Sequence, residues 1–497
     1  MVGKEDLLSM CKRRGYLWRS ADIYGGEAGF YDYGHLGTKL LESWKDEWKD
    51  FFLGLDENYH MIRTNNIMPH SVMEASGHVD HFSDIMIGCE RCDSYFRGDR
   101  LIEDETGENA EWMGKEEMKS KIEELNLSCP DCGGSFSEPE DFNMMFSVSL
   151  GPTGKKTGFL RPETAQGTYI NFRREYRALR KKMPLGLASI GSAFRNEISP
   201  RQIVFRKREF LQAELQIFFV PGIHDKKFEE KFAEIEEMKV SIKRTEWDES
   251  RNVHLKDVED LPRFYLYHLG KMYEFYTDVM ELSPDEIRFR ELSEGEKAFY
   301  NKIHFDLEVD FDTLNGWKEI SGLHYRSDYD LKQHQENSNQ DLSVSTEEGK
   351  RIPHVIELSF GIDRNLWALL DRGFRQDDRD WMYLPKKLTP RQVAVFPLVR
   401  KDGLPEKSRE IFEDLRSDFR VTWEKSGSIG KRYARNDEVG TAYCITVDYD
   451  TMEDDSVTIR DINTKEQIRV DIARLKDVLS GLIEGRKKFE NYLEKDD

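Results

Sequence analysis

The stretch PLGLASIGSAFRNEISPRQIVFRKREFLQAELQIFFV, at residues 184–220, predicts two β-strands joined by the basic segment NEISPRQIVFRKRE. Apolar and polar side chains alternate along the second strand, so its two faces differ. One face carries Leu211, Ala213, Leu215 and Ile217, and the other carries Gln212, Glu214 and Gln216. The same period puts Arg195 and Glu197 on one face of the first strand. This pattern predicts a sheet with one side against a core and the other side lining a polar cleft.

The segments on either side of this hairpin add further elements. After His354, two faces alternate again, with Glu357 and Ser359 on one and Ile356, Leu358 and Phe360 on the other. Beyond Gly361 the pattern IDRNLWALLDRGF is helical. Upstream, the apolar residues from Leu36 to Leu55 recur at helical spacing and predict an amphipathic helix. A strand from Tyr59 to Met68 is expected next, closed by Pro69.

A chain of 497 residues exceeds what one hydrophobic core usually holds, so two or three domains are expected. Residues 85–138 are expected to form an insertion, because they contain two cysteine pairs and a long polar stretch but no continuous apolar pattern. Residues 221–300 are rich in charge and helical in character, which indicates a second insertion or a peripheral layer. Strands and helices then alternate, which predicts a first domain over 1–388 and a compact α/β domain over 389–497.

The composition indicates a folded globular protein, with 38% hydrophobic and 12% aromatic residues. The 95 acidic residues outnumber the 74 basic ones, and the net charge of −21 argues against broad, non-specific binding of nucleic acid. An RNA partner would therefore have to meet a local basic patch. No apolar run is long enough to span a bilayer, and the N-terminal segment has no secretory signal. We therefore expect a cytoplasmic protein without a membrane partner.

Four of the six cysteines form two C-x-x-C pairs, Cys89 with Cys92 and Cys129 with Cys132. Four thiolates can close a tetrahedral structural zinc site. In a chain without a secretion signal, this spacing favours a metal over disulfides. The alternative is a loop with four free cysteines or with partly lost ligands. We predict a structural Zn²⁺ site.

Three separated segments carry charges that suit a nucleoside triphosphate, FRNEISPR (194–201), RKREF (206–210) and GIDR (361–364). Guanidinium groups donate hydrogen bonds in a fixed fork that fits phosphate oxygens. For any single arginine, a solvated charged hairpin is the simpler interpretation, but three segments agree. A phosphate-loop site has no support, because GPTGKKTG at 151–158 lacks the required spacing.

These motifs resemble a known family. FRNEISPR resembles motif 2 of class II aminoacyl-tRNA synthetases, SFGIDR resembles motif 3, and the helix at 36–55 with the strand ending at Pro69 resembles motif 1, which builds the dimer interface in that family. A narrower resemblance, to the dimeric glycyl-tRNA synthetases, is carried by longer strings: GGEAGFYDYG (25–34), RPETAQGTYINF (161–172), REFLQAEL (208–215), GWKEISG (316–322), HVIELSFGIDR (354–364) and GSIGKRYARNDEVGTAYCITVDYDT (427–451). The four cysteines match the metal-binding insertion of some bacterial and archaeal members.

The resemblance implies an α+β fold, with an antiparallel-sheet class II catalytic domain that carries insertions and a C-terminal α/β anticodon-binding domain. It implies a homodimer that attaches glycine to the 3′ end of tRNA(Gly) through a glycyl-adenylate, with ATP and Mg²⁺. The glycine carboxylate is already an anion, so the first step needs alignment and charge neutralisation more than a general base.

The resemblance also implies roles for single residues around ATP. Arg195 would hold the α-phosphate, Arg206 and Arg364 the outer phosphates, and Phe210 would stack on adenine. Glu319 is the candidate Mg²⁺ ligand, since hard cations prefer carboxylate oxygen. Arg195, Glu319 and Arg364 form the implied catalytic set.

Glu197 would lie beside the adenosine or the arriving tRNA end. For the amino acid, the family pattern points to Glu163, Glu214, Glu357 and Ser359. A ring of carboxylates can attract the ammonium group and fill the space that a side chain would need, which suits glycine. Without the resemblance, Glu357 and Ser359 are equally well explained as an ordinary polar strand face.

In the C-terminal domain, Lys431, Arg432 and Arg435 would supply the local positive charge for tRNA, although a solvated basic surface is the simpler interpretation. Two rivals to this function remain testable. A synthetase for another small amino acid is disfavoured by the carboxylate pattern. A non-catalytic relative that binds nucleic acid is disfavoured by the retained arginines and Glu319.

Overall fold

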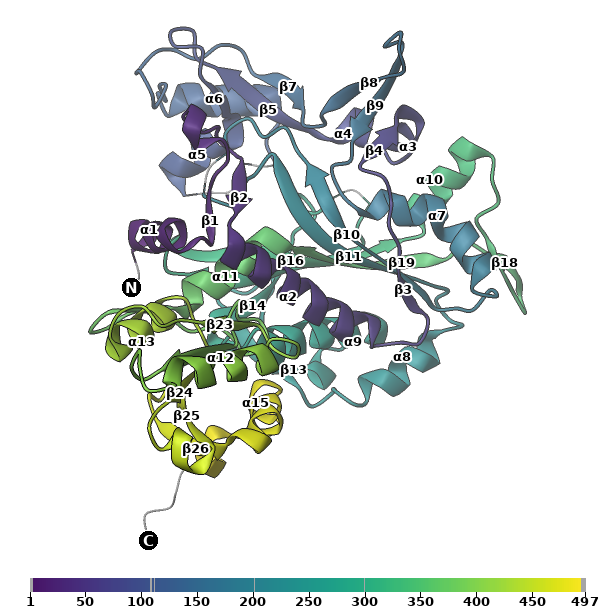
Figure 1. Ribbon diagram of the computed structural model, residues 1–497. Coiled ribbons are helices and arrows are strands. Elements are labelled where there is room, and N and C mark those ends of the chain that lie inside the picture. Colours follow the sequence, from purple (N-terminus) through teal and green to yellow (C-terminus); the bar gives the residue numbers. More distant parts are fainter. Residues whose placement is uncertain (1–2, 108–109, 111, 201, 299, 493–497) are drawn as a thin grey trace.

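The hairpin at 184–220 lies toward one edge of the largest sheet (Figure 1). The computed structural model describes residues 3–107, 110, 112–200, 202–298 and 300–492, and within these ranges the sheet has nine strands in the order β13-β12-β14-β15-β16-β19-β11-β10-β3. Its strands are β3 (Tyr59–Met61), β10 (Leu185–Phe194), β11 (Glu209–Phe219), β12 (Lys239–Lys243), β13 (Arg251–His254), β14 (Ile287–Glu291), β15 (Ile303–Phe311), β16 (Gly316–Ser327) and β19 (His354–Gly361). The strand predicted around His354 is β19, which pairs antiparallel with β11.

One face of this sheet carries the main core. The helices α2 (His35–Leu53), α9 (Arg263–Glu274) and α11 (Ile362–Gly373) contribute buried residues to the same cluster as the apolar faces of β11 and β19. Trp48 of α2, for example, meets Phe360 of β19 edge to face, with ring centroids 5.8 Å apart. The amphipathic helix predicted from Leu36 to Leu55 is confirmed as α2. The polar residues that alternate with this core face the other side of the sheet.

Residues 83–143 fold against their own small sheet at the top of Figure 1. It consists of β5 (Ser83–Gly88), β6 (Tyr95–Arg97) and β7 (Glu140–Asn143), and α5 (Gly98–Thr106) and α6 (Lys115–Glu124) pack on it. Ile87, Ile102 and Met118 are buried in a cluster separate from the main core. The expected insertion at 85–138 falls here, and β7 lies just beyond its expected end.

Residues 221–300 extend the central sheet. They supply α8 (Asp225–Phe232), α9 and the three strands at one end of the sheet, β13, β12 and β14, of which β13 is the edge strand. Ile242 and Phe289 from these strands are buried in the main core. The segment therefore shares the core of the nine-stranded sheet.

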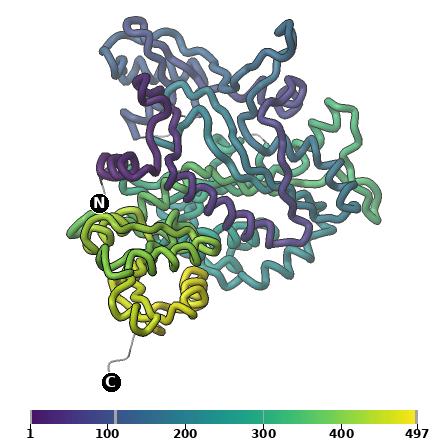
Figure 2. Tube along the Cα trace, in the orientation of Figure 1, coloured from purple at the N-terminus to yellow at the C-terminus, as the bar shows by residue number. Residues whose placement is uncertain are grey.

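The C-terminal part forms a second sheet with a separate core. Its strands are β22 (Val393–Pro397), β23 (Val421–Trp423), β24 (Tyr443–Val447), β25 (Ser456–Asp461) and β26 (Gln467–Asp471), with α12 (Leu404–Leu415), α13 (Ile429–Glu438), α14 (Thr451–Asp454) and α15 (Leu475–Ile483). α1 (Lys4–Arg14) lies beside this part (Figure 2). There Arg14 forms an ion pair with Glu438, and the Tyr16 hydroxyl donates a hydrogen bond to the Val439 carbonyl at 2.9 Å.

Two boundaries differ from the sequence prediction. The strand expected from Tyr59 to Met68 is two strands, because β3 pairs with β10 while β4 (Ile67–Pro69) pairs with β9 (Lys156–Leu160) of another sheet. β10 ends at Phe194, so Arg195 and Glu197 lie in the connection after it.

The remaining elements are β1 (Leu17–Arg19), β2 (Tyr31–Tyr33), α3 (His70–Ala75), α4 (His78–His81), β8 (Ser147–Leu150), α7 (Ala165–Ala178), α10 (Tyr329–Ser338), β17 (Val344–Thr346), β18 (Gly349–Arg351), β20 (Phe374–Gln376) and β21 (Asp380–Met382), with short helices at 22–24, 255–257, 275–279, 284–286, 472–474 and 489–492. None of the described helices is long and apolar enough to cross a membrane.

Candidate active site

A cleft of about 450 Å³ opens on the polar side of the central sheet. The residues predicted to bind ATP or glycine all line it: Arg195, Glu197, Arg206, Phe210, Glu319, Arg364, Glu163, Glu214, Glu357 and Ser359. They come from distant parts of the chain, and β11, β16 and β19 bring them together as neighbouring strands. Arg201, the last residue of the FRNEISPR string, lies outside the described residues.

Arg195 is held between two aromatic rings. Its guanidinium lies 5.3 Å from the centroids of both Phe82 and Phe210, and its Nε donates to the Pro162 carbonyl at 3.3 Å. Cation–π contacts of this kind fix the direction of a guanidinium while leaving its other donors for a ligand. Phe210 thus helps to orient Arg195.

Arg364 stands on the first turn of α11 and meets Glu319 of β16. Its Nη1 lies 2.9 Å from Glu319 Oε2, and the charge of Arg364 lowers the pKa of Glu319 although enclosure in the cleft acts in the opposite direction. Arg206 lines the same end, where burial and the nearby Arg100 lower the pKa of its guanidinium. The guanidinium groups of Arg206 and Arg100 therefore repel one another at this end of the cleft. A bound polyphosphate would offset that repulsion.

The donors beside Arg364 suit a hard divalent cation. The Glu319 side chain is 46% exposed to the cleft, and Asp306 lines the cleft from the neighbouring strand β15. Burial and the charge of Glu319 raise the pKa of Asp306 to about 6. The two carboxylates repel one another. Mg²⁺ is bound in proteins by one or two carboxylates together with phosphate oxygens.

Glu214 lies at the bottom of the other end of the cleft. Its carboxylate accepts hydrogen bonds from Thr164 Oγ1 at 2.6 Å and from Ser359 Oγ at 2.9 Å. Burial, together with the charges of Glu357 and Glu163, raises the pKa of Glu214 to about 8. Among the described residues, no Lys, Arg or His lies within ion-pair distance of Glu214, whose hydrogen-bond partners are these two hydroxyls.

Arg326, which sequence reasoning missed, organises the other two carboxylates. Its side chain is 1% exposed, and its nitrogens lie 3.2 Å from Glu357, 3.8 Å from Glu163 and 2.8 Å from Asp330. Its guanidinium also lies 3.9 Å from the centroid of the Tyr300 ring. Its charge lowers the pKa of Glu163 against the effect of burial. Alternation along GWKEISGLHYR could have placed Arg326 on the face of Gly322 and His324.

Asp363 connects two of the sequence strings that carry the resemblance, GGEAGFYDYG and REFLQAEL, to the helix α11. It accepts hydrogen bonds from the Leu211 backbone N–H at 2.7 Å, from the Tyr33 hydroxyl at 2.5 Å and from Lys207 Nζ at 2.8 Å. The residue thereby ties the YDYG segment, the basic connection and the start of β11 to the helix that carries Arg364. Its role is to hold the cleft in shape.

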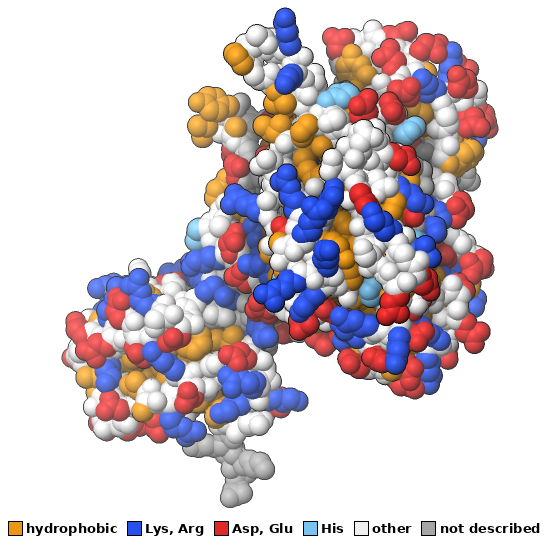
Figure 3. All heavy atoms as spheres, turned by 90° about the vertical axis from the view of Figure 1, so that its right-hand side faces the viewer, with side chains coloured by type: hydrophobic (Ala, Val, Ile, Leu, Met, Phe, Trp, Pro, Cys, Tyr) orange, Lys and Arg blue, Asp and Glu red, His pale blue; other side chains and the backbone are white. Residues whose placement is uncertain are grey.

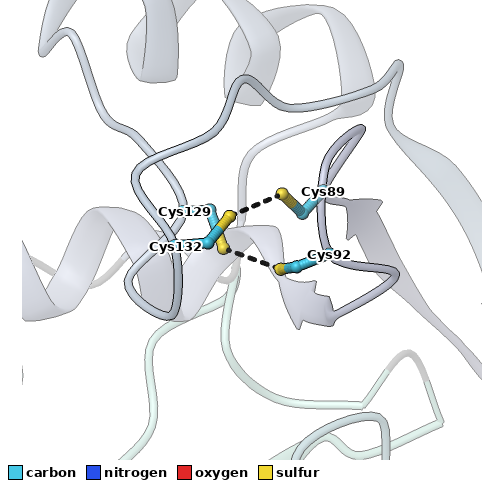
Figure 4. A group of neighbouring side chains, drawn as sticks. All are labelled: Cys89, Cys92, Cys129 and Cys132. Atoms are coloured by element: carbon cyan, nitrogen blue, oxygen red, sulfur yellow. Dashed lines mark hydrogen bonds between the residues drawn. The ribbon is translucent and has the colours of Figure 1, made fainter.

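The four cysteines of the two C-x-x-C pairs converge between β5 and the loop after α6 (Figure 4). Their sulfurs lie within 4.8 Å of one another, and the closest pairs are Cys89 with Cys132 at 3.5 Å and Cys92 with Cys129 at 3.6 Å. Sulfurs bound to one tetrahedral zinc at about 2.3 Å would stand about 3.8 Å apart. All four cysteines are free, so the geometry fits a thiolate metal site.

Of the three basic residues predicted to form a surface on α13, Lys431 is exposed but Arg432 is buried. Arg432 is 1% exposed, and its guanidinium donates to the Pro397 and Leu398 carbonyls. Arg435 pairs with Glu424 at 2.7 Å. Lys431 is exposed. The structure therefore removes Arg432 from the predicted tRNA surface, because a helix face that looks solvated in sequence is turned inward.

Comparison with known proteins defines the class. The family model "tRNA synthetase class II core domain (G, H, P, S and T)" matches residues 150–373, and the model "Anticodon binding domain" matches residues 392–482. A prolyl-tRNA synthetase of Cryptosporidium parvum, crystallised with L-proline and AMP, has the same fold with a TM-score of 0.59 at 14% identity, over 96% of this chain and 75% of that one. The structure titled as the RNA binding domain of threonyl-tRNA synthetase from the same organism gives 0.60 at 16% identity, over 96% and 98%. The fold is that of a class II aminoacyl-tRNA synthetase.

Closer relatives narrow the class to one family. The glycine–tRNA ligase of Methanothrix thermoacetophila is 36% identical over 98% of both chains. That of Methanocaldococcus jannaschii is 34% identical over 96% of this chain and 98% of its own, and that of Pyrococcus furiosus is 35% identical over 97% and 99%. The chain belongs to the glycine–tRNA ligase family.

Proposed function

We propose that this protein attaches glycine to the 3′ end of tRNA(Gly), with ATP, through a glycyl-adenylate. One observation carries the proposal: the same cleft is lined by a cluster of arginines and by a buried group of carboxylates around Glu214. The arginines fit phosphate oxygens and the carboxylates fit an ammonium group. The two ends of the cleft thus match the two substrates of amino-acid activation.

In this reaction the cleft aligns an anionic nucleophile with a phosphate. Arg195, held by Phe82 and Phe210, would bind the α-phosphate and stabilise the charge that builds up there. Arg206 and Arg364 would hold the outer phosphates. Mg²⁺ bound with ATP would neutralise phosphate charge beside Glu319, where Asp306 supplies a second carboxylate oxygen.

Specificity for glycine would come from lack of space. Glu214, Glu357 and Glu163 surround the position of the ammonium group and occupy the volume that a side chain would need. A pocket that admits no additional methyl group can exclude larger amino acids without an editing domain.

The remaining proposals concern assembly and tRNA. Residues 1–388 would form the catalytic unit and 389–497 the anticodon-binding unit, with Lys431 and Arg435 near the RNA. Zn²⁺ held by the four cysteines would stabilise residues 83–143. The protein would act as a cytoplasmic homodimer, and sedimentation as a monomer at working concentration would exclude this.

The deciding experiment is amino-acid-dependent exchange of pyrophosphate into ATP with Mg²⁺, testing glycine, alanine, serine and proline separately. Exchange with glycine alone is expected. Exchange with another amino acid would move the specificity, and no exchange by the folded protein would favour a non-catalytic relative.

A further inference from the structure

Two stretches of chain join the unit that carries the four cysteines to the rest of the protein. They are residues 78–82 and residues 143–145, which we call the neck. Asn143 Nδ2 donates to the Val79 carbonyl at 3.0 Å, and the Met144 backbone N–H donates to the Phe82 carbonyl at 3.1 Å. The two stretches are therefore fixed to each other by hydrogen bonds.

One side chain of the neck reaches the α-phosphate end of the cleft. The centroid of the Phe82 ring lies 5.3 Å from the Arg195 guanidinium. The neck also contacts the next residue, because the Asn196 backbone N–H donates to the Met144 carbonyl at 2.7 Å. An arginine loses much rotamer freedom when a ligand fixes it, so contacts that fix it in advance favour binding.

A second side chain of the neck reaches the glycine end of the cleft. His78 Nε2 lies 3.7 Å from Glu163 Oε2, within ion-pair distance when the imidazole is protonated. The other ring nitrogen, Nδ1, lies 2.8 Å from the Ser76 hydroxyl, which donates to the Met73 carbonyl at 3.1 Å. The imidazole is therefore held in place on the side away from Glu163.

The two side chains of the neck also contact each other. The ring centroids of His78 and Phe82 lie 5.3 Å apart, with an angle of 49° between the ring planes. Arg195 Nε donates to the carbonyl of Pro162, the residue before Glu163, at 3.3 Å. The contacts thus form a closed ring from Glu163 through His78 and Phe82 to Arg195. A shift of the neck would move both ends of the cleft.

The unit beyond the neck reaches the phosphate end as well. Arg100 of α5 lines the cleft, and burial together with the charge of Arg100 lowers the pKa of the Arg206 guanidinium. The Ser199 hydroxyl, in the connection that carries Arg206, donates to the Tyr95 carbonyl at 3.0 Å. The four-cysteine unit is therefore in contact with the activation site at more than one point.

Packing alone explains part of this arrangement. Phe82 belongs to a small apolar cluster with Met68, Met73 and Met145. An aliphatic side chain of similar size would fill the same space. It would not, however, offer a guanidinium the negative face of an aromatic ring.

His78 differs from the charged residues of the surface. Figure 3 shows exposed Lys, Arg, Asp and Glu side chains spread over much of one face of the protein. The side chains of His78 and Glu163 are 5% and 10% exposed, so water and salt screen their interaction little. Removing one partner of a buried polar contact is costly, whereas a solvated surface contact contributes little.

We propose that His78 and Phe82 are positioning residues for glycine activation, with Phe82 orienting Arg195 at the α-phosphate and His78 orienting Glu163 at the ammonium group. The inference rests on the function proposed above. It gives the neck of the four-cysteine unit a part in adenylate formation, a step that takes place without tRNA.

The test measures glycine-dependent pyrophosphate exchange without tRNA in matched variants. Phe82→Leu keeps an apolar side chain but loses the ring face. Its kcat should therefore fall about 10-fold, as expected for losing one cation–π contact that orients a catalytic group. The KM for glycine should change less than about twofold. Phe82→Tyr retains the ring face and should restore most of kcat.

His78→Leu should show the opposite division between the two kinetic constants. Glu163 loses a buried partner at the ammonium position, so the KM for glycine should rise about 10-fold, while kcat at saturating glycine should change less than about twofold. His78→Gln retains an N–H donor near the position of Nε2 and should recover part of the loss in KM.

Phe159→Leu is the matched control for packing. Phe159 lies on β9 in the same apolar cluster as Phe82 and is half-buried like it, but its ring contacts His70. This variant should keep both kinetic constants. The number of active sites, counted from the burst of adenylate formation, and the melting temperature distinguish altered sites from unfolded protein.

An unchanged kcat in Phe82→Leu, or an unchanged KM for glycine in His78→Leu, would overturn the inference. Equal losses in Phe82→Leu and Phe159→Leu would do the same, since packing would then account for Phe82. If a leucine variant does not fold, Phe82→Met and His78→Asn carry the same expectations. Failure of the wild-type protein to exchange with glycine would refute the proposed function, and the inference with it.

Discussion

Glycine should bind more tightly as the pH rises toward 8, because Glu214 must lose a proton to receive the ammonium group. Burial and the charges of Glu357 and Glu163 raise the pKa of Glu214 to about 8. Below that pH most molecules carry a neutral carboxyl at this position. An ammonium ion is better stabilised by a carboxylate than by a carboxylic acid.

The size of the effect follows from the fraction of ionised Glu214. With a pKa of about 8, that fraction is about one half at pH 8, one eleventh at pH 7 and one hundredth at pH 6. The apparent Kd equals the intrinsic value divided by the competent fraction. It should therefore rise about 50-fold between pH 8 and pH 6, with little change above pH 8.5.

Isothermal titration of the protein with glycine measures both the Kd and the protons exchanged. At pH 7, binding should release about 0.9 proton per site, detected as a dependence of the heat on the ionisation enthalpy of the buffer. Glu214→Gln should bind weakly and with no dependence on pH in this range. A flat profile for the wild-type protein, or a slope that persists in Glu214→Gln, would refute the reasoning.

The same pKa has a consequence for stability. Folding raises the pKa of Glu214 from 4.5 to about 8, so its contribution is unfavourable above pH 4.5 and grows until about pH 8. At about 1.4 kcal/mol per pH unit, this amounts to about 5 kcal/mol at most. Without glycine, Glu214→Gln should therefore melt higher than the wild-type protein at pH 8 and alike at pH 4.5, whereas a lower melting temperature at pH 8 would contradict the assignment.

Three further predictions test other parts of the molecule. Cys132→Ser should lose the stoichiometric zinc detected by elemental analysis and make residues 83–143 sensitive to protease, and zinc-free wild-type protein with the same resistance would exclude the site. Glu319→Gln should lower pyrophosphate exchange about 100-fold or more at saturating glycine, through lost charge stabilisation at the phosphates, and an unchanged rate over a Mg²⁺ titration would remove Glu319 from the site. Arg432→Gln should destabilise the C-terminal domain by about 1–3 kcal/mol without changing the salt slope of tRNA binding, because it leaves buried carbonyls unpaired; a changed slope with unchanged melting would restore Arg432 to the surface.

The hairpin at 184–220 and its neighbour could be predicted because alternation with a period of two is a direct result of strand geometry. Glu214 and Ser359 lie where that period puts them, on the side opposite the core. The same reasoning extended β10 too far, to Glu197, because side-chain pattern does not mark where backbone pairing stops. The same reasoning predicted β3 and β4 as one strand. Local sequence does not show that the two short strands pair with different sheets.

The buried cations were the least predictable part of the structure. Arg432 faces inward on α13, with Asn436 and Asp437 also buried on that helix. Arg326 is buried under the cleft. A sequence shows that a residue is charged but not whether carbonyls or carboxylates elsewhere in the fold compensate it. The residues that line the cleft follow from the resemblance, whereas Arg326, which pairs with their carboxylates, follows only from the folded structure.

The charges in the pocket themselves indicate the ligand. Arg326 lies within ion-pair distance of Glu163, Glu357 and Asp330, and among the described contacts Glu214 has only the hydroxyls of Thr164 and Ser359. A buried carboxyl without a cation either remains protonated or waits for one. Any cation that binds there must be small, because the carboxylates fill the surrounding space. An ammonium group attached to a carbon without a side chain satisfies both conditions, and a larger amino acid would have to displace a carboxylate that Arg326 holds in place.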